Sequence, residues 1–377
     1  MAQPIRVLHV IDKFSMDGVN PSSCSRLFAE WIPLHDKSRF QVDVAGLRAK
    51  DAAAKFLESH GIQVFYINKG KISPAIIGEI ARIARDGNYD ILHLHGYTSA
   101  NFGRIAARKL GIRSVMHEHA ILKIQPHQFI VDWMLKRKTD VAVAVSDAVK
   151  TFMGSGRSVP LEKVKVIWNG VALDSFKNVD PEAAKSFRQQ FNIPFDATIV
   201  GTITRLREEK GNAPFLDAAK LVLEEFPDTH FVLVGDGPLK AELETRATQL
   251  GIRNRVVFTG FVANILPALE SMDVVAVPSL REGFGLAMVE AMACRKPVVA
   301  TRVGGMVEIA EDGKSALLVP PANGRALADA ILRMLRDTAF REKIADQGRE
   351  VSQKFSIEKN VQALEQLYTE LAHKGAA

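Results

Sequence analysis

The sequence contains few residues able to build a disulfide framework or a cysteine-ligated metal site. Its 377 residues include two cysteines, three tryptophans and four tyrosines. Cys24 and Cys294 lie far apart without metal-ligand spacing, which indicates a reducing compartment. No apolar run approaches the roughly 20 residues of a membrane span, and the start MAQPIRVLHVIDKF has no apolar segment ahead of a small-residue cleavage site. We therefore expect a cytoplasmic protein.

Basic residues outnumber acidic ones only in the first half of the chain. Residues 1–180 hold 25 Lys and Arg against 17 Asp and Glu, a net charge of +8, whereas the remainder has a net charge of −2. A basic half is typical of a protein that meets an anionic partner, such as a phosphate-bearing ligand or an acidic lipid surface. Scattered surface lysines produce the same balance, so charge alone leaves both interpretations open.

Short apolar, β-branched runs alternate with helix-length segments along the whole chain. Such strands, separated by helices, are typical of parallel sheets that are covered on both faces. The chain is longer than one core usually supports, so we predict two doubly wound α/β domains. The runs lie at residues 5–11, 40–47, 64–67, 90–95, 113–119, 141–146, 164–168, 197–203, 230–237, 256–260, 274–279, 297–301 and 316–320.

The domain boundary is predicted between Asp174 and Pro181, where the strand–helix pattern pauses and restarts. Residues 1–175 would form the first domain and residues 176–356 the second. Near the C-terminus, apolar residues recur at helical spacing in IEKNVQALEQLYTELAHK. We therefore expect a terminal helix over 357–377 that completes the first domain.

The stretch EGFGLAMVEAM begins at Glu282 and follows the strand-like VVAVPS. Gly283 and Gly285 are typical of a turn, and Leu286 begins a run of acceptable helix formers. Ligands of open α/β sheets bind beyond the carboxyl ends of the strands. Backbone N–H groups at such a helix start face an anion, and glycine permits close approach. We predict that the turn and helix start, including Phe284, hold a diphosphate.

Two glutamates, Glu282 and Glu290, flank this predicted anion site. Glu290 would lie about one turn into the helix with its side chain tilted back towards the N-terminus, where it would accept hydrogen bonds from hydroxyl groups. A carboxylate at Glu282 would repel phosphate, so it is also expected to meet hydroxyl donors. A ligand with hydroxyl-rich groups at both ends of a diphosphate is a nucleotide sugar.

These motifs resemble those of the retaining nucleotide-sugar glycosyltransferases of family 4. The family's pattern of two glutamates separated by seven residues is present from Glu282 to Glu290, and RLREEKG follows a strand-like run. The resemblance covers most of the chain, from RVLHVIDKF through DILHLHG and FVLVGDGP to RVGGMVEI. It implies the GT-B fold, in which two Rossmann-like domains face a central cleft. The first domain would be on the acceptor side and the second would bind the donor.

The resemblance assigns Arg205 and Lys210 of RLREEKG to the diphosphate of the donor. Both side chains remain protonated and donate charge-assisted hydrogen bonds to phosphate. The alternative is a solvated charge cluster in which Glu208 and Glu209 are the partners. Arg207 lacks support from the resemblance and is expected at the surface.

Two strand-like runs end in histidine pairs, His93 with His95 and His117 with His119. In the family, a histidine after the strand that contains His117 lies near the donor sugar. The resemblance therefore assigns a catalytic role to His119, and we consider His95 an acceptor-side candidate. A neutral imidazole would hydrogen-bond sugar hydroxyls or assist proton movement. Since alternate strand residues share a face, a metal site is the alternative; we expect core roles for His93 and His117, and neither metal nor cofactor.

Glycine-rich turns follow two of the strand-like runs. MDGVN supplies Asp17, Gly18 and Asn20, whereas the family usually has two glycines and then a glutamate, so the match is partial. Gly18 still permits close approach of a ligand to the backbone. The turn GDG at Gly235 supplies only the first two glycines of a dinucleotide fingerprint, which argues against a nicotinamide enzyme. We expect it beside the nucleoside instead.

We predict a retaining enzyme that transfers a sugar from a nucleoside diphosphate donor to a hydroxyl acceptor, in polysaccharide or glycolipid assembly. UDP is expected from its prevalence in the family, and relatives contact the base through the backbone at the positions of Phe261 and Val262. The cations and the helix start would stabilise charge on the leaving diphosphate without divalent metal. The alternatives are a nonhydrolysing nucleotide-sugar epimerase and a non-catalytic nucleotide-sugar-binding protein. No nucleic-acid partner is expected.

The segment HQFIVDWMLKRK, residues 127–138, combines apolar and basic residues. On a helix, its apolar side chains form a stripe beside a basic end, which is typical of a segment that lies on an anionic membrane surface. The alternative is a helix that buries this stripe against the sheet. The stripe consists of Phe129, Ile130, Trp133 and Met134, and the basic end of Lys136, Arg137 and Lys138.

Overall fold

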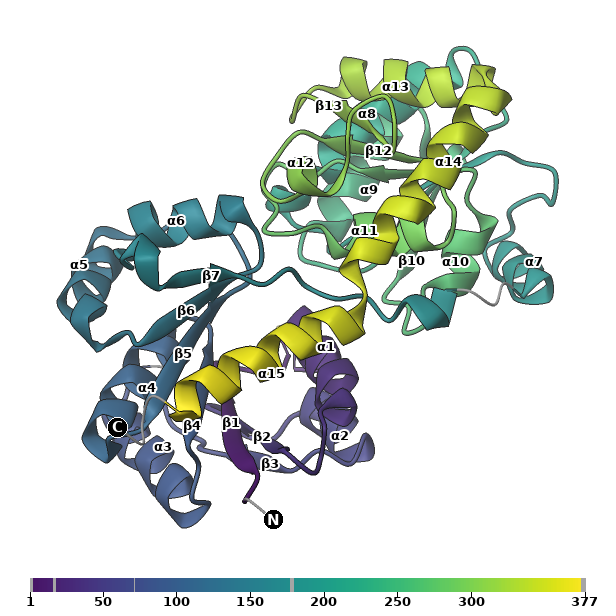
Figure 1. The fold of residues 1–377 in the computed structure, drawn as a ribbon. Coiled ribbons are helices and arrows are strands. Elements are labelled where there is room, and N and C mark those ends of the chain that lie inside the picture. Colours follow the sequence, from purple (N-terminus) through teal and green to yellow (C-terminus); the bar gives the residue numbers. More distant parts are fainter. Residues whose placement is uncertain (1–2, 16–17, 71, 177–179, 374–377) are drawn as a thin grey trace. The chain divides into compact units, whose positions relative to one another are not determined.

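The computed structural model describes residues 3–15, 18–70, 72–176 and 180–373 (Figure 1). The chain divides into two compact units, one formed by Met1–Gly170 with Ile357–Ala377 and the other by Val171–Ser356. The sequence pattern predicts this boundary at residue 175, with the terminal helix belonging to the first domain. Among the described residues, no helix combines the length and the apolar character needed to cross a membrane.

Unit 1 is built on a parallel sheet with the strand order β3-β2-β1-β4-β5-β6-β7. Its core strands are buried on both faces because helices cover each side (Figure 1). The strands are β1 (Ile5–Ile11), β2 (Phe40–Gly46), β3 (Val64–Tyr66), β4 (Ile91–His95), β5 (Arg113–Glu118), β6 (Val141–Ala144) and β7 (Val164–Val166). The α-helices are α1 (Ser23–Trp31), α2 (Ala52–Ser59), α3 (Ala75–Asp86), α4 (Tyr97–Leu110), α5 (Pro126–Leu135), α6 (Asp147–Arg157) and α15 (Ile357–His373).

Unit 2 repeats the design with the parallel strand order β10-β9-β8-β11-β12-β13. Its strands are β8 (Ile199–Ile203), β9 (His230–Val234), β10 (Val256–Gly260), β11 (Val274–Val277), β12 (Val298–Thr301) and β13 (Leu317–Val319). Its α-helices are α7 (Pro181–Gln190), α8 (Asn212–Leu223), α9 (Lys240–Gln249), α10 (Leu266–Ser271), α11 (Leu286–Ala293), α12 (Met306–Ile309), α13 (Gly324–Arg336) and α14 (Thr338–Ser352). Every predicted apolar run contains a strand, which confirms the doubly wound α/β fold.

Each sheet has a switch point, where the strand order reverses direction along the sheet. In unit 1 the switch lies between β1 and β4, and in unit 2 it lies between β8 and β11. The connections that leave the carboxyl ends of these neighbouring strands turn in opposite directions, which opens a crevice at that edge of an α/β sheet. The residues that follow β1, β4, β8 and β11 are therefore the first to consider for ligand binding.

Helix α5 turns its apolar stripe towards solvent, so the alternative in which this stripe is buried against the sheet is wrong. The exposed fractions are 41% for Phe129, 56% for Ile130, 54% for Trp133 and 66% for Met134. The buried members of the helix are Asp132 and Leu135. The helix therefore presents a large apolar surface outwards.

Asp132 explains this orientation of α5 because it is the centre of a buried ion network. Its carboxylate accepts hydrogen bonds from Arg104 Nη2 at 2.9 Å and from Arg157 Nε at 2.6 Å, and all three side chains are fully or almost fully buried. Arg157 also pairs with Glu118 at the end of β5. Burial lowers the pKa of Arg104 to about 10. Rotating α5 to bury its apolar stripe would separate these paired buried charges, at a high cost in free energy.

Replacing Asp132 is therefore expected to destabilise unit 1 strongly. Asp132→Ala leaves two buried guanidinium groups short of a partner, and breaking a buried pair costs about 3–5 kcal/mol. Urea unfolding followed by tryptophan fluorescence measures this loss, because all three tryptophans lie in unit 1. The control is Asp86→Ala, which removes the exposed partner of Arg82 and should change stability little. Equal midpoints for the two variants would contradict the expectation.

Candidate active site

Lys210 and Glu282, which are 72 residues apart, meet at the switch point of unit 2. Lys210 ends the short 3-10 helix η5 (Glu208–Lys210) after β8, and Glu282 lies in the loop after β11. Lys210 Nζ donates to Glu282 Oε2 at 2.6 Å, and Ser279 Oγ donates to the same oxygen at 3.1 Å. Both charged residues are partly buried. The structure thus brings together Lys210, which is predicted to bind phosphate, and Glu282, which is predicted to bind the sugar.

Backbone contacts hold the two loops against one another. The carbonyl oxygen of Glu209 accepts hydrogen bonds from the N–H groups of Leu280 and Arg281 at 2.8 and 3.2 Å. Gly304, after β12, has φ +52°, and a Cβ there would lie 1.7 Å from the carbonyl oxygen of Glu282. Only glycine fits this position without displacing the loop. Ser279 and Gly304 were missed as site residues, although RVGGMVEI offered the glycine as a sequence signal.

The predicted helix start lies at the same edge of the sheet. Gly285 is the N-cap of α11, with φ +117°, and the helix begins at Leu286 as predicted. Phe284 is 2% exposed and packs edge-on against Phe355, so its side chain belongs to the core while its backbone belongs to the turn. Glu290 is half-buried within α11. A helix start of this kind favours an anion.

The remaining donor-side predictions fall on the loops after β8, β9 and β10. Arg205 is exposed, Arg207 lies 3.9 Å from Glu209, and Lys210 pairs with Glu282, so the segment is not simply a cluster paired with its own glutamates. These loops contact one another through the backbone: Gly235 N–H donates to Gly260 at 3.0 Å. Phe261, 42% exposed, and the half-buried Val262 follow β10.

In unit 1 the predicted glycine loop is only partly described. Gly18 has φ +83°, and its N–H donates to Ser15 Oγ at 2.8 Å. Asp17 lies outside the described residues. Asp12 directly follows β1. Its carboxylate accepts hydrogen bonds from the N–H groups of Thr98 and Ser99 at the start of α4. Asp12 therefore stabilises the α4 N-terminus and links the carboxyl ends of β1 and β4.

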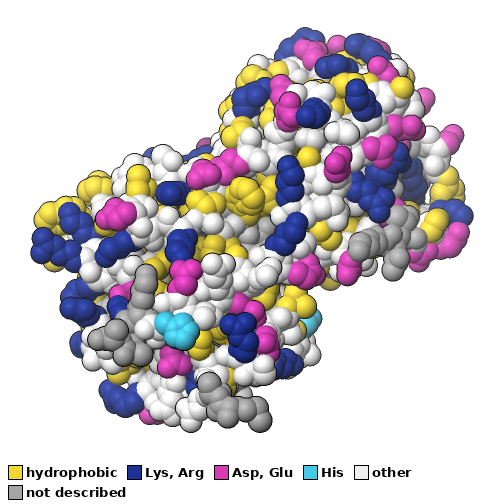
Figure 2. Space-filling view, viewed as in Figure 1, with side chains coloured by type: hydrophobic (Ala, Val, Ile, Leu, Met, Phe, Trp, Pro, Cys, Tyr) yellow, Lys and Arg dark blue, Asp and Glu magenta, His cyan; other side chains and the backbone are white. Residues whose placement is uncertain are grey.

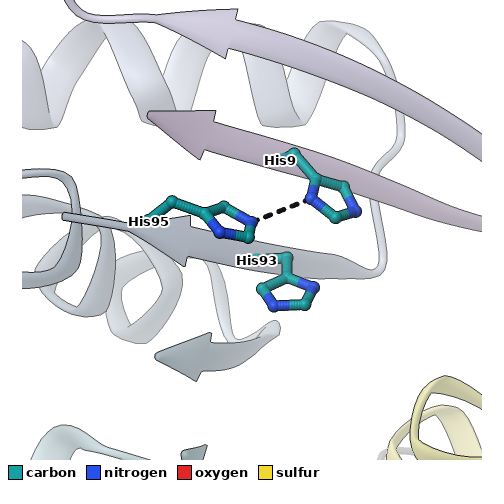
Figure 3. Close-up of side chains that lie close together, drawn as sticks. All are labelled: His9, His93 and His95. Carbon is teal, nitrogen blue, oxygen red and sulfur yellow. Dashed lines mark hydrogen bonds between the residues drawn. The ribbon is translucent and has the colours of Figure 1, made fainter. Parts of the chain in front are cut away.

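The four unit 1 histidines of the two strand-end pairs gather at the switch point of that unit. His93 and His95 of β4 and His117 of β5 are buried, and His119 follows β5 and is half-buried. His9 of β1 joins them, although no sequence motif singled it out (Figure 3). It pairs with His93 in the register of the parallel sheet. Alternate residues of three neighbouring strands thus place their side chains on one face.

Hydrogen bonds connect these rings to each other and to the last helix. The ring nitrogens lie 2.9 Å apart between His9 and His95, 2.9 Å between His95 and His119, and 3.0 Å between His93 and His117. Tyr368 of α15 bridges the remaining ends, with its hydroxyl 2.6 Å from His93 Nδ1 and 3.2 Å from His9 Nε2. Only His117 Nε2 and His119 Nδ1 have no hydrogen-bond partner among the described residues of this cluster.

The same histidines offer a metal ion two sets of ligands. The sets His9–His93–His95 and His95–His117–His119 each hold nitrogens within 4.8 Å of one another. Two nitrogens on one tetrahedral zinc ion would lie about 3.3 Å apart, given bonds of ~2.0–2.1 Å. The paired nitrogens here lie 2.9–3.0 Å apart, within hydrogen-bond range. Pairing between rings accounts for these distances, and a metal-free site remains a prediction.

Burial keeps these histidines neutral. It lowers the pKa of His9, His93, His95 and His117 well below 6.5, and it lowers the pKa of His119 to about 4. Nearby histidines lower the first four values further, because a second positive charge in the cluster would be repelled. A neutral imidazole carries one N–H donor and one acceptor nitrogen.

Comparison with known proteins agrees with this geometry. Residues 184–351 match the family described as Glycosyl transferases group 1, and residues 30–175 match Glycosyltransferase Family 4. The chain is 30% identical over 316 residues to D-inositol 3-phosphate glycosyltransferase of Saccharomonospora viridis, covering 77% of this chain and 73% of that protein. It is 29% identical to alpha-D-kanosaminyltransferase of Streptomyces kanamyceticus, covering 74% and 76%.

The solved structures extend the similarity to the whole fold. The crystal structure of Anabaena HepE in complex with UDP-glucose has a TM-score of 0.85 and 27% sequence identity, covering 97% of this chain and 100% of that one. The fold is therefore that of the GT-B glycosyltransferases. The chain belongs to the group 1 glycosyltransferases, with the N-terminal region of family 4.

Mild acid is expected to destabilise unit 1. The pKa values of the clustered histidines are lower in the folded protein than in the unfolded chain, so the unfolded chain binds more protons once the pH falls below about 6.5. Stability is then lost as the pH falls, by about 1.4 kcal/mol per pH unit for each histidine that stays neutral. The urea midpoint from tryptophan fluorescence should be much lower at pH 5.5 than at pH 7.5. The exposed-residue variant His60→Gln should keep this dependence, and a pH-independent midpoint would disprove neutral burial.

Proposed function

We propose that the protein transfers a sugar from a nucleoside diphosphate sugar, with UDP as the nucleotide, to a hydroxyl acceptor with retention of configuration. The observation that carries this proposal is the meeting of Lys210, Glu282 and the start of α11 at the switch point of unit 2. A cation, a carboxylate and a helix N-terminus suit a ligand that joins phosphate to hydroxyl groups. The UDP-glucose complex of HepE supports the choice of ligand.

The proposed reaction needs stabilisation of the charge that grows on the leaving diphosphate. Arg205, Lys210 and the N–H groups at the start of α11 would supply it in place of a divalent metal. The bond between the anomeric carbon and the phosphate oxygen breaks, the acceptor oxygen bonds to that carbon from the same face, and the acceptor proton passes to the departing phosphate. Glu282 would hold hydroxyls of the sugar, and Glu290 those of the ribose.

Thermal unfolding with a panel of nucleotides and nucleotide sugars tests this proposal. A ligand at 100 times its dissociation constant should stabilise the protein by ~2.7 kcal/mol. We expect UDP and one UDP-sugar to raise the midpoint equally with and without EDTA. Release of UDP that depends on an added acceptor would separate a transferase from an epimerase, which would change the sugar without an acceptor. No shift with any nucleotide would refute the proposal.

The contact between Lys210 and Glu282 predicts how variants at these two positions rank in their affinity for UDP. Lys210→Ala should weaken UDP binding by about 1.5–3 kcal/mol, because it removes a charged donor and leaves the Glu282 carboxylate beside the diphosphate. Glu282→Gln should spare UDP binding and reduce turnover, and the double variant should bind UDP more tightly than Lys210→Ala alone. Glu290→Ala should weaken UDP binding. Calorimetry measures each affinity.

Lys314→Ala serves as the matched control, since it removes an exposed lysine of the same unit that pairs with Glu311. Its affinity for UDP should equal that of the unmodified protein. If Lys210→Ala also bound UDP with unchanged affinity, the assignment of this lysine to the diphosphate would be wrong.

We also propose that α5 attaches unit 1 to an anionic membrane surface, which would place a lipid-linked acceptor near the enzyme. The support is the exposed stripe of Ile130, Trp133 and Met134, beside the short 3-10 helix η2 (Lys136–Lys138). Lys136 Nζ lies 5.0 Å from the centre of the Trp133 ring. Figure 2 shows hydrophobic and basic side chains side by side over α5, at the left of the view. This pattern suits the boundary between headgroups and acyl chains.

Sedimentation with liposomes tests the membrane proposal. The protein should bind vesicles containing an anionic phospholipid at low salt, and the bound fraction should fall with salt or with neutral vesicles, since each basic residue near the surface contributes about 1 kcal/mol. Changing Lys136, Arg137 and Lys138 to Ser, or Trp133 and Met134 to Ser, should abolish binding. The control changes three exposed basic residues elsewhere in unit 1 to Ser, namely Lys37, Arg108 and Lys109. If the control variant lost vesicle binding to the same extent, net charge rather than α5 would explain the binding. If the unmodified protein did not bind anionic vesicles, a soluble acceptor would be favoured.

A further inference from the structure

The hydrogen bonds between the unit 1 histidines form one unbranched chain. Every bond between two rings joins the Nδ1 atom of one histidine to the Nε2 atom of the next, and the tyrosine hydroxyl joins a remaining Nε2 atom to a remaining Nδ1 atom. The order along the chain is His119, His95, His9, Tyr368, His93 and His117. The chain therefore runs head to tail, with a free ring nitrogen at each end.

Proton counting, together with the burial of the tyrosine hydroxyl, limits this chain to two arrangements. Each neutral imidazole and the phenol contribute one hydrogen, which gives six hydrogens for five hydrogen bonds and two free ends. When every bond is made and the hydroxyl donates within the chain, the sixth hydrogen occupies one end or the other. If the hydroxyl accepted from both His9 and His93, its own hydrogen would be buried without an acceptor among the described residues, which is costly. Because the chain runs head to tail, all five histidines then share a tautomer: all carry their hydrogen on Nδ1, or all carry it on Nε2. The tautomers are thus coupled.

The two arrangements differ at the free ends. In the Nε2–H arrangement, His117 would hold a donor without an acceptor in a position that is 2% exposed, with its ring parallel to that of Trp31. Buried N–H groups without an acceptor are rare. In the Nδ1–H arrangement, the unpaired donor is instead Nδ1 of His119. This atom is also buried, but its residue is only half-buried and directly follows the carboxyl end of β5, the edge at which α/β sheets bind ligands. The Nδ1–H arrangement is therefore favoured.

We propose that Tyr368 and the four buried histidines act as one cooperative chain that holds His119 in its Nδ1–H tautomer, so that His119 donates a hydrogen bond to a ligand oxygen. Tyr368, which lies on the last helix, is then a positioning residue that acts through His9 and His95. The identity of the ligand rests on the proposed function, in which the acceptor atom is a hydroxyl oxygen of the donor sugar. The coupling within the chain does not depend on that function.

Nitrogen-15 NMR of the full-length protein with labelled histidine tests the coupling directly. Correlations between ring nitrogens and carbon-bound ring protons distinguish the two tautomers. We expect five histidines to show the same Nδ1–H pattern at pH 7.5, while the exposed His60 and His127 serve as internal references. A mixture of tautomers among the five, or an imidazolium among them, would overturn the proposal. This measurement needs no variant and no substrate.

The variant Tyr368→Phe should uncouple the chain. Without the hydroxyl, the His119–His95–His9 segment and the His93–His117 segment no longer constrain each other, so the His119 signals should shift towards a tautomer mixture. Turnover at saturating donor should fall roughly three- to tenfold, which corresponds to one neutral hydrogen bond. Unchanged His119 signals in this variant would overturn the proposal.

Tyr89→Phe is the matched control for this variant. Tyr89 is a buried tyrosine of the same unit, and its hydroxyl donates to Asp43 at 2.6 Å outside the histidine chain. It should lose stability without changing any histidine tautomer or the turnover. Absence of sugar transfer by every form of the protein would refute the proposed function. The NMR result would still show whether the tautomers within the histidine chain are coupled.

Discussion

The reversal of strand order within each parallel sheet is the constraint on which both candidate sites depend. The segments that follow β8 and β11 leave these neighbouring strands in opposite directions. Lys210 and Glu282 lie in these two segments and meet at the carboxyl edge between the strands. The same reversal between β1 and β4 brings together His9 and His95. Parallel pairing therefore gathers residues distant in sequence at one edge, because the carboxyl ends of all strands point the same way.

The two switch points use this geometry with opposite electrostatics. In unit 2 the partly buried pair of Lys210 and Glu282 retains enough contact with water to keep charges at the edge, beside a helix start that favours an anion. In unit 1 almost complete burial makes charge costly, so the clustered histidines remain neutral and satisfy one another. The charged, partly hydrated edge of unit 2 thus suits a phosphate, whereas the desolvated edge of unit 1 suits hydroxyl groups.

Helix α5 shows a buried charge determining which face of a helix points outwards. Its apolar stripe would ordinarily pack on the sheet, but Asp132 must meet two buried arginines on the opposite side of the helix. Separating these charges costs more free energy than exposing several apolar side chains. A membrane that covered the exposed side chains would offset part of the cost of their exposure. The same ion network thus stabilises unit 1 and leaves the apolar stripe of α5 exposed.

The sequence alone determined the strands, the doubly wound class and the family, because apolar periodicity and glycine turns are local properties. It also placed Glu282, Lys210 and the start of α11 at strand ends. It did not reveal His9 or Tyr368, because only the register of β1 with β4 and the packing of α15 bring them to the other histidines. The tertiary structure likewise decided the outward face of α5, since the arginines that bury Asp132 come from α4 and α6, and pairing between distant helices leaves no periodic signal in the sequence.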